Sequence, residues 1–384
     1  MTDAAMTKKG LEGVVIAQTR LSKVFGDEGR LIYCGYDIHD LAQHASFEEV
    51  VYLLWHKELP TRAQLDDFKA SKHDCTEIPD FIFDHMTYYA KNAHPMAALR
   101  TAVSGLAMWD PVPDDTTPEH IAHAACQITW AMPAIIAGWE RIRNGKEPIA
   151  SRDGELDHAA NFLWMLKGEA PDALSVRVLD TYLILLADHG MNASTFAARV
   201  TTSTLSDLYS AITSAIGTLK GAAHGGANEA AMRQFVEIGA VENVEPWFRK
   251  ARAEGRRIMG IGHRVYKTQD PRAVELAAIA EKLAEQKGGD VLKYFTIAKK
   301  LVEVARADDY FIERNLYPNV DYYSAVALHA VGVPIDQFTP IFAMSRIAGW
   351  TAHILEQWAD NRLIRPRGDY VGPDHLTWKP IDAR

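Results

Sequence analysis

The sequence predicts a mainly α-helical protein with a large and a small domain. Apolar residues recur with helical spacing along most of the 384 residues, whereas alternating strand patterns are scarce. The chain is too long for one ordinary domain, so two are expected. No linker rich in Gly, Ser or Pro divides the sequence. We therefore expect one domain to be built from sequence-distant pieces, with the other inserted between them.

The first predicted elements lie near the start of the chain. Two short strands are expected within residues 13–38, on either side of the turn sequence GDEG. A helix should follow, because Ser46 and Glu49 form a capping-box pattern ahead of an apolar stretch that Pro60 ends.

Four later stretches predict further helices, at residues 173–188, 206–221, 270–289 and 334–361. The first is nearly all apolar, which indicates a buried helix. The second has Ser206 as its expected cap and Gly221 as its stop. The third has Asp270 at the cap, Pro271 at the first helical position and a glycine stop.

Composition limits the class of protein. The formal net charge of -9 argues against a nucleic-acid or membrane-surface protein, which would usually be basic. Cys34, Cys75 and Cys126 form no CxxC motif and no disulfide framework, which favours a cytoplasmic protein. The first 13 residues contain no apolar signal core, and no apolar run reaches transmembrane length.

A cation-rich segment stands out in this acidic chain. The sequence GIGHRVYKTQDPR at 260–272 places Gly262 and Arg264 beside His263, and EGRRIMG precedes it with two more arginines. Arg272 lies just inside the proline-started helix, where backbone N–H groups favour an anion. A solvated charge cluster would not need this glycine spacing, so we expect a site for a small anionic ligand.

Two histidines lie in other polar segments between apolar helices. His189, in DHGMNAS, follows the buried helix, and Asn192 or Ser194 can cap the next one. His224 precedes two glycines in KGAAHGGANE, where a ligand could approach the backbone closely. A helix-terminal histidine and an ordinary helix corner are the alternative interpretations.

Three further charged residues are candidates for the same site. Asp321 stands in the apolar segment YPNVDYYSAV, where a carboxylate is paired, functional or a helix cap. Arg346 lies among apolar residues, so we expect a carboxylate partner for it. Arg365 could provide a second planar clamp for a carboxylate.

The sequence shows no metal or nucleotide motif. HExxH, a P-loop and a strand-linked GxGxxG are absent, and His353 and Glu356 lack a second nearby ligand. We expect no metal and no cofactor.

Five motifs together resemble those of the citrate synthase family. In chain order they are DHGMNAST, HGGAN, GIGHRVYKTQDPR, YPNVD and DNRLIRP. The resemblance extends from Gly10 to the C-terminus and is closest to the short bacterial and archaeal members. Ile261 and Lys267 are mild departures from the family pattern.

The resemblance implies a homodimer in which a small domain, residues 224–326, closes over the substrates, while residues 1–223 and 327–384 form the large domain. It implies the tricarboxylic acid cycle reaction, in which acetyl-CoA and oxaloacetate condense and the citryl thioester is hydrolysed. Asp321 would be the base, His224 the donor to the thioester oxygen, and His263 the group that polarises the oxaloacetate carbonyl. The residues implied for oxaloacetate are His189, Arg272, Arg346 and Arg365, the last probably from the partner subunit. Those implied for CoA are Arg256, Arg257, Ile258, Met259, Gly260 and Lys267.

Two other functions stay open at this point. A 2-methylcitrate synthase would use propionyl-CoA on the same scaffold. A non-catalytic protein that binds CoA or a dicarboxylate is an alternative of another class, which the joint presence of His224, His263 and Asp321 disfavours.

Overall fold

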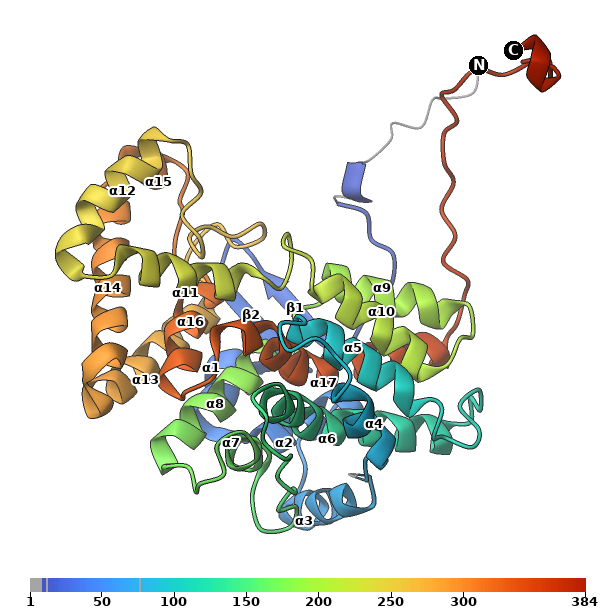
Figure 1. The fold of residues 1–384 in the computed structure, drawn as a ribbon, viewed down its shortest axis with the longest axis horizontal. Helices are drawn as coiled ribbons and strands as arrows, with labels where there is room; N and C mark the ends of the chain where they lie inside the picture. The colour runs from blue at the N-terminus through green and yellow to red at the C-terminus, as the bar shows by residue number, and fades with distance from the viewer. Residues whose placement is uncertain (1–8, 12, 76) are drawn as a thin grey trace.

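The computed structural model describes residues 9–11, 13–75 and 77–384, and within them the fold is mainly helical, as predicted (Figure 1). The α-helices are α1 Ile38–His44, α2 Phe47–His56, α3 Arg62–Ser71, α4 Asp80–Met86, α5 Pro95–Leu106, α6 Pro118–Arg143, α7 His158–Lys167, α8 Ala173–Leu186, α9 Ala193–Ser203, α10 Leu208–Leu219, α11 Ala227–Ile238, α12 Val244–Ala253, α13 Pro271–Lys287, α14 Gly289–Arg306, α15 Asp309–Glu313, α16 Val320–Ala330 and α17 Phe338–Ala359. The segment Met1–Lys8, part of the stretch without a signal core, lies outside the described residues.

The predicted strands form a small antiparallel sheet near the start of the chain. Strand β1, Ser22–Phe25, pairs with β2, Arg30–Tyr33, and β3, Tyr36–Asp37, pairs with the other edge of β2. The predicted GDEG sequence forms the turn between β1 and β2. Its Gly26 carbonyl accepts a hydrogen bond from the Lys267 N–H at 3.0 Å, so the hairpin lies directly against the cation-rich segment.

Local capping signals explain most helix starts. Ser46 and Glu49 form the predicted capping box of α2, and Asp270 caps α13 ahead of Pro271. The predicted cap of α10 was wrong by one residue. Asp207 is the N-cap, because its carboxylate accepts both the N–H of Ser210 at 2.8 Å and its hydroxyl at 2.5 Å.

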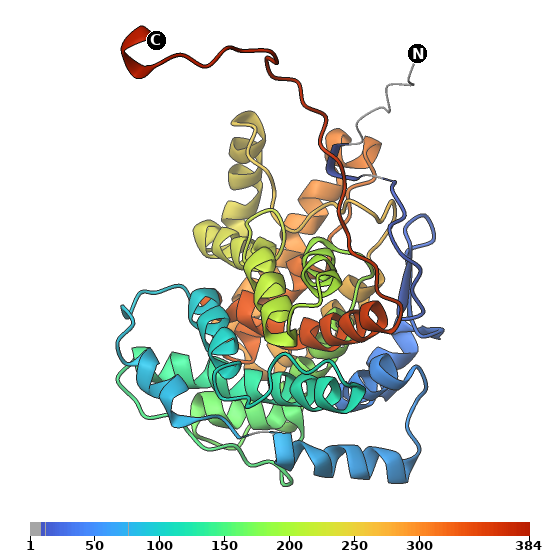
Figure 2. The same cartoon turned by 90° about the vertical axis from the view of Figure 1, so that its right-hand side faces the viewer.

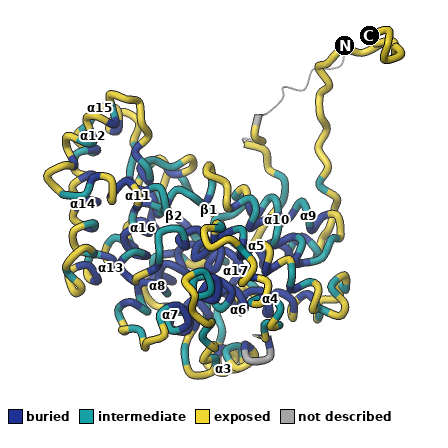
Figure 3. The backbone as a smooth tube through the Cα atoms, viewed as in Figure 1, coloured by how far each residue is buried: buried dark blue, intermediate teal, exposed yellow. Residues whose placement is uncertain are grey.

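Helices α6, α8 and α17 run through the core of the larger group of helices (Figures 2 and 3). In the described part of the chain, α6 alone is long and apolar enough to cross a membrane, contrary to our reading of the apolar runs. However, 83% of its most apolar window is buried inside the fold, as in the core helix of a globular protein.

A second group of helices, α11 to α16, lies to one side of the molecule (Figure 1). Helix α16 packs against α11, α13 and α14, and it also contacts α8 of the larger group. The predicted end of the small domain at residue 326 falls inside α16, so the domain boundaries stay a prediction.

The cysteine prediction was wrong. Cys75 and Cys126 form a disulfide that joins the short helix Lys72–Cys75 to α6, and Cys34 remains free. The two residues are 51 apart in sequence, with Cα atoms 5.8 Å apart, so spacing along the chain gave no sign of the pairing.

Candidate active site

Three histidines from separate segments meet where the two groups of helices face each other. His189 follows α8, His224 precedes α11, and His263 lies in the cation-rich segment before α13. The ring centroids of His189 and His263 are 5.5 Å apart, and His189 Nε2 is 3.3 Å from the hydroxyl of Tyr266. The fold therefore brings together residues more than 70 positions apart in sequence.

The hydrogen bonds of His263 fix which ring nitrogen faces the site. The backbone N–H groups of Val265 and Tyr266 donate to Nδ1 at 3.0 and 3.1 Å. Since Nδ1 accepts, the proton of the neutral ring is on Nε2. Burial and the nearby Arg272 lower the pKa of His263 to about 4, so near neutral pH this histidine is an uncharged hydrogen-bond donor.

His224 is oriented by α9 in a similar way. The N–H of Ser194 donates to Nε2 at 3.3 Å, and the Ser194 hydroxyl lies 2.8 Å from the same nitrogen. Trp350 Nε1 donates to that hydroxyl at 3.1 Å. With Nε2 as an acceptor, Nδ1 carries the proton. Burial, followed by the Arg346 charge, lowers the pKa of His224 to about 4.

Asp321 lies in the first turn of α16, and no described residue hydrogen-bonds to its carboxylate. Burial raises the pKa of Asp321 to about 6, against the opposing effect of Arg272. Its helix is capped by Asn319, whose Nδ2 also donates to the Gly262 carbonyl at 2.8 Å. The helix that carries Asp321 and the His263 segment are thus joined by one side chain.

Arg272 is held by a carboxylate that we had expected only as a helix cap. Its Nε and Nη2 donate to Asp270 Oδ1 and Oδ2 at 3.0 and 2.9 Å. Asp270 Oδ2 also accepts the N–H of Val320 at 3.0 Å. In the described chain Nη1 of Arg272 has no hydrogen-bond partner, which leaves one edge of the guanidinium for a ligand.

The described chain does not itself supply the carboxylate partner expected for Arg346. Arg346 is only 1% exposed, and its Nε donates to the Leu186 carbonyl at 2.7 Å. No carboxylate among the described residues lies within ion-pair distance, and burial lowers the pKa of Arg346. A buried cation without a partner is costly, so this site favours an incoming anion.

Comparison with known proteins agrees with this geometry. The family model described as "Citrate synthase, C-terminal domain" matches residues 10–367. The chain belongs to the citrate synthase family. "Citrate synthase 2" of Bacillus subtilis is 46% identical, over 98% of this chain and 99% of that protein. "2-methylcitrate synthase" of Mycobacterium tuberculosis is 43% identical, over 95% and 90%. The predicted family is thereby confirmed.

Solved citrate synthases share the fold. The enzyme of Pyrobaculum aerophilum has a TM-score of 0.89 at 40% identity, with 97% of this chain and 94% of that chain covered. The enzyme of Thermoplasma acidophilum, solved as a ternary complex with carboxymethyl coenzyme A and oxaloacetate, has a TM-score of 0.90 at 37% identity, with 97% and 98% covered.

The residues that citrate synthase resemblance implies for CoA form one loop. Both Nη atoms of Arg256 are bound to Glu237, at 2.9 and 2.8 Å, whereas Arg257 and Lys267 are exposed. Ile258 is buried, and the N–H of Met259 donates to Gln234 at 2.9 Å. Gly260, with φ +76°, packs against Tyr322. Arg257 and Lys267 are therefore the cations most accessible to a phosphate.

Arg365 is not brought to the site within this chain. It lies in the exposed tail that follows α17 and extends away from the body (Figures 1 and 2). Its role therefore depends on a second subunit and stays a prediction.

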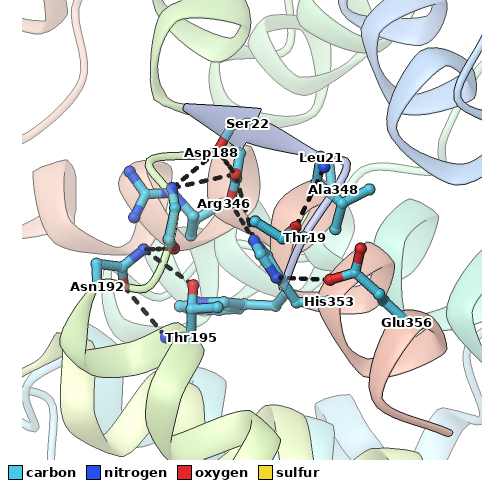
Figure 4. A network of polar contacts seen from close by, with 12 residues as sticks. Thr19, Leu21, Ser22, Asp188, Asn192, Thr195, Arg346, Ala348, His353 and Glu356 are labelled. Atoms are coloured by element: carbon cyan, nitrogen blue, oxygen red, sulfur yellow. Dashed lines mark hydrogen bonds and ion pairs between the residues drawn. The ribbon is translucent and has the colours of Figure 1, made fainter. Parts of the chain in front are cut away.

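Sequence reasoning also missed a buried polar network behind His189. Asp188 contacts Ser22 and His353, and His353 leads to Arg199 and Glu356 (Figure 4). We had considered His353 and Glu356 only as an incomplete metal pair. In the described residues no group of three or more His, Cys, Asp or Glu side chains could hold a metal ion.

Proposed function

We propose that the protein is a citrate synthase that condenses acetyl-CoA with oxaloacetate and hydrolyses citryl-CoA to citrate and CoA. One observation supports this most directly: the unpaired Asp321 carboxylate lies in the same site as neutral, oriented His224 and His263. A weak carbon acid needs a base together with a donor at the developing enolate oxygen.

The residue roles follow from these protonation states. The Asp321 carboxylate removes a proton from the methyl group of acetyl-CoA. The Nδ1–H of His224 donates to the thioester oxygen, so that charge is stabilised as the enol forms. The enol carbon then attacks the oxaloacetate carbonyl, which the Nε2–H of His263 polarises. Water cleaves the thioester in the final step and releases CoA.

Charge complementarity explains the preference for a dicarboxylate. Arg272 and Arg346 are both buried and each has part of its guanidinium without a described partner. Two such forks suit two carboxylates. His189, whose pKa is well below its usual value because of burial and Arg272, adds an uncharged donor. We propose that Arg365 of a second copy completes the oxaloacetate site in a homodimer.

The test is release of free CoA thiol from acetyl-CoA, with citrate identified by mass spectrometry. Thiol should appear only when oxaloacetate is present. Oxaloacetate binding by calorimetry without thiol release would instead support a non-catalytic binding protein.

A 2-methylcitrate synthase is the second candidate, since a relative of that name is 43% identical. Tyr322 does not line the acyl site, because its hydroxyl donates to the Ala298 carbonyl at 2.8 Å and its ring packs behind Gly260. We expect both thioesters to react, with acetyl-CoA preferred. One methylene is worth only about 1–3 kcal/mol. A higher kcat/KM for propionyl-CoA, at saturating oxaloacetate, would favour 2-methylcitrate.

A further inference from the structure

A fully buried carboxylate and imidazole lie directly behind the proposed oxaloacetate site. Asp188 and His353 are both 0% exposed. Nε2 of His353 is 3.3 Å from Oδ1 and 3.4 Å from Oδ2 of Asp188 (Figure 4). The residue after Asp188 is His189. The Asp188–His353 pair is therefore next to a proposed oxaloacetate-binding residue, although neither member of the pair is proposed to touch the substrate.

The Asp188 carboxylate holds the backbone that follows His189. Its Oδ2 accepts the Ser22 hydroxyl and the Gly190 N–H, the latter at 3.2 Å. The same Gly190 N–H lies 2.9 Å from Ser22 Oγ. The residue before His189 is thus bonded to the residue after it, and this contact restrains the direction of the intervening His189 side chain.

The other face of the imidazole determines its tautomer. Nδ1 of His353 is 3.3 Å from Nη1 of Arg199, which in turn donates to Glu356 at 2.9 Å. A guanidinium can only donate. Nδ1 of His353 is therefore an acceptor, and Nε2 carries the proton that it donates to Asp188.

Helix α17 carries both His353 and the substrate-binding Arg346, seven positions apart, which places them two turns apart on one face. Arg346 also bonds to the Leu186 carbonyl at the end of α8. At Gly349, between them, an added Cβ would lie 2.5 Å from both Ala187 O and Asp188 Oδ1. The close approach of α17 to the Asp188 segment therefore ties the helix that carries Arg346 to the segment that carries His189.

We propose that His353, acting through Asp188, is a positioning residue that sets the geometry of His189 and Arg346 for oxaloacetate. This inference rests on the proposed function. A purely structural pair would instead contribute to folding alone, without a selective effect on one substrate.

The experiment compares four variants with the wild type. His353→Leu removes the N–H group that donates to Asp188, whereas His353→Gln keeps an amide N–H donor at a similar reach. Asp188→Asn replaces one carboxylate oxygen by an NH₂ group, which cannot accept hydrogen bonds from its neighbours. Thr351→Val is the matched control, because Thr351 is equally buried on α17 but accepts from Trp55 at 2.8 Å, away from the site. The readouts are KM for each substrate, kcat, oxaloacetate binding by calorimetry and thermal unfolding.

We expect KM for oxaloacetate to rise on the order of tenfold or more in His353→Leu and Asp188→Asn, since small misplacements of binding groups have effects of that size. KM for acetyl-CoA at saturating oxaloacetate should change much less. His353→Gln should bind oxaloacetate nearly as tightly as the wild type does. Thr351→Val should also keep the wild-type affinity for oxaloacetate, even if its melting temperature falls.

Three outcomes would overturn the inference in an active wild type. They are unchanged oxaloacetate KM in folded His353→Leu or Asp188→Asn, equal losses for both substrates, and an equal rise in Thr351→Val. If His353→Leu does not fold, the oxaloacetate KM values of Asp188→Asn and His353→Gln test the inference instead. A wild type that forms no citrate would overturn the proposed function itself, and this inference with it.

Discussion

At the scale of single residues, the site holds each titratable group in a form suited to carbon-acid chemistry. Burial pushes the pKa of His224 and His263 down to about 4 and that of Asp321 up to about 6. Near neutral pH the histidines are neutral donors and the aspartate is an anion with a raised affinity for a proton. Opposite pKa shifts thus separate the two proposed donors from the proposed base.

Asp321→Asn tests the base directly. The amide keeps the size of the side chain but cannot accept the methyl proton, so kcat should fall about 10²- to 10⁴-fold. Because the raised pKa means that the ionised carboxylate is unfavourable in the folded state, the variant should melt no lower than the wild type at pH 8. Near-native turnover in the folded variant would exclude Asp321 as the base.

The pH profile of kcat/KM should reflect the same group. Below a pKa of about 6 the carboxylate of the free enzyme becomes protonated, so the rate should fall progressively as pH drops below 6. His224 and His263 titrate only near pH 4, outside this window. The measurement is kcat/KM for acetyl-CoA between pH 5 and 9, with folding checked at each pH. A kcat/KM that stays constant down to pH 5 in the folded enzyme would contradict the raised pKa of Asp321.

The sequence identified these three residues because glycines or polar breaks mark their segments. Their partners were not predictable. Ser194 and His224 are 30 positions apart, and Asp188 and His353 are 165 apart. Each partner also has an ordinary local role, as Asp270 has at the cap of α13, so no local signal reveals its second contact.

At the scale of elements, the loop that carries His263 is held between the N-terminal hairpin and α16. Lys267 bonds to the hairpin at Gly26, and Gly262 N–H donates to the Tyr317 carbonyl at 2.7 Å. Asn319 N–H donates to the Gly260 carbonyl at 2.9 Å. The loop has little secondary structure of its own, so its geometry comes from these two neighbours.

Gly260→Ala should disturb this element, whereas Gly255→Ala is a matched control. Both glycines have positive φ, +76° and +68°, so each substitution should cost about 1–2 kcal/mol of unfolding free energy. A Cβ at Gly260 would also lie 2.9 Å from the Cα of Tyr322, while nothing lies within 4 Å at Gly255. Only Gly260→Ala should therefore lower kcat/KM. Denaturant unfolding and steady-state kinetics measure the two effects, and equal kinetics in both variants would refute the account.

The helices that could be predicted are those whose caps and apolar periodicity agree, as in α2 and α13, or whose stretch is nearly all apolar, as in α8. The error at α10 shows the limit of such signals. Ser206 and Asp207 are both good caps by type, and the choice between them depends on which side chain reaches Ser210. That geometry is set by the packed helix rather than by residue preference.

At the scale of the whole molecule, the disulfide closes a long segment of the large group of helices. A crosslink between residues 51 apart restricts the unfolded chain, with a stabilisation of up to about 4 kcal/mol in the chain-entropy model. A reductant should therefore lower the melting temperature of oxidised wild type. Cys75→Ser should melt at one temperature with or without reductant. Identical melts of the wild type in both conditions, with all three cysteines titrating as thiols in the unfolded non-reduced protein, would mean that the disulfide does not form.

The tail after α17 raises the question of how the oxaloacetate site is completed. The tail extends away from the rest of the molecule as an exposed segment without a helix or strand at Arg365 (Figure 2). The subunit to whose site Arg365 contributes therefore depends on how two subunits assemble. If the chain is a homodimer, Arg365 of one subunit can complete the site that contains Asp321 of the other. Only an experiment that mixes subunits distinguishes this arrangement from a tail that folds back on its own subunit.

Asp321→Asn and Arg365→Ala provide that experiment, because each homodimer should be nearly inactive for a different reason. In a mixed dimer with Arg365 acting across the interface, one site combines an intact Asp321 with an intact Arg365 from the partner, and activity returns. With Arg365 acting within its own subunit, neither site is complete and the mixture stays inactive. The two variants are co-expressed with different tags, the mixed dimer is purified through both tags, and its kcat is compared with that of each homodimer. Recovery should approach half of the wild-type kcat per dimer, since one of two sites is intact, whereas a mixed dimer no more active than its parents would place Arg365 in its own subunit's site or outside the site altogether.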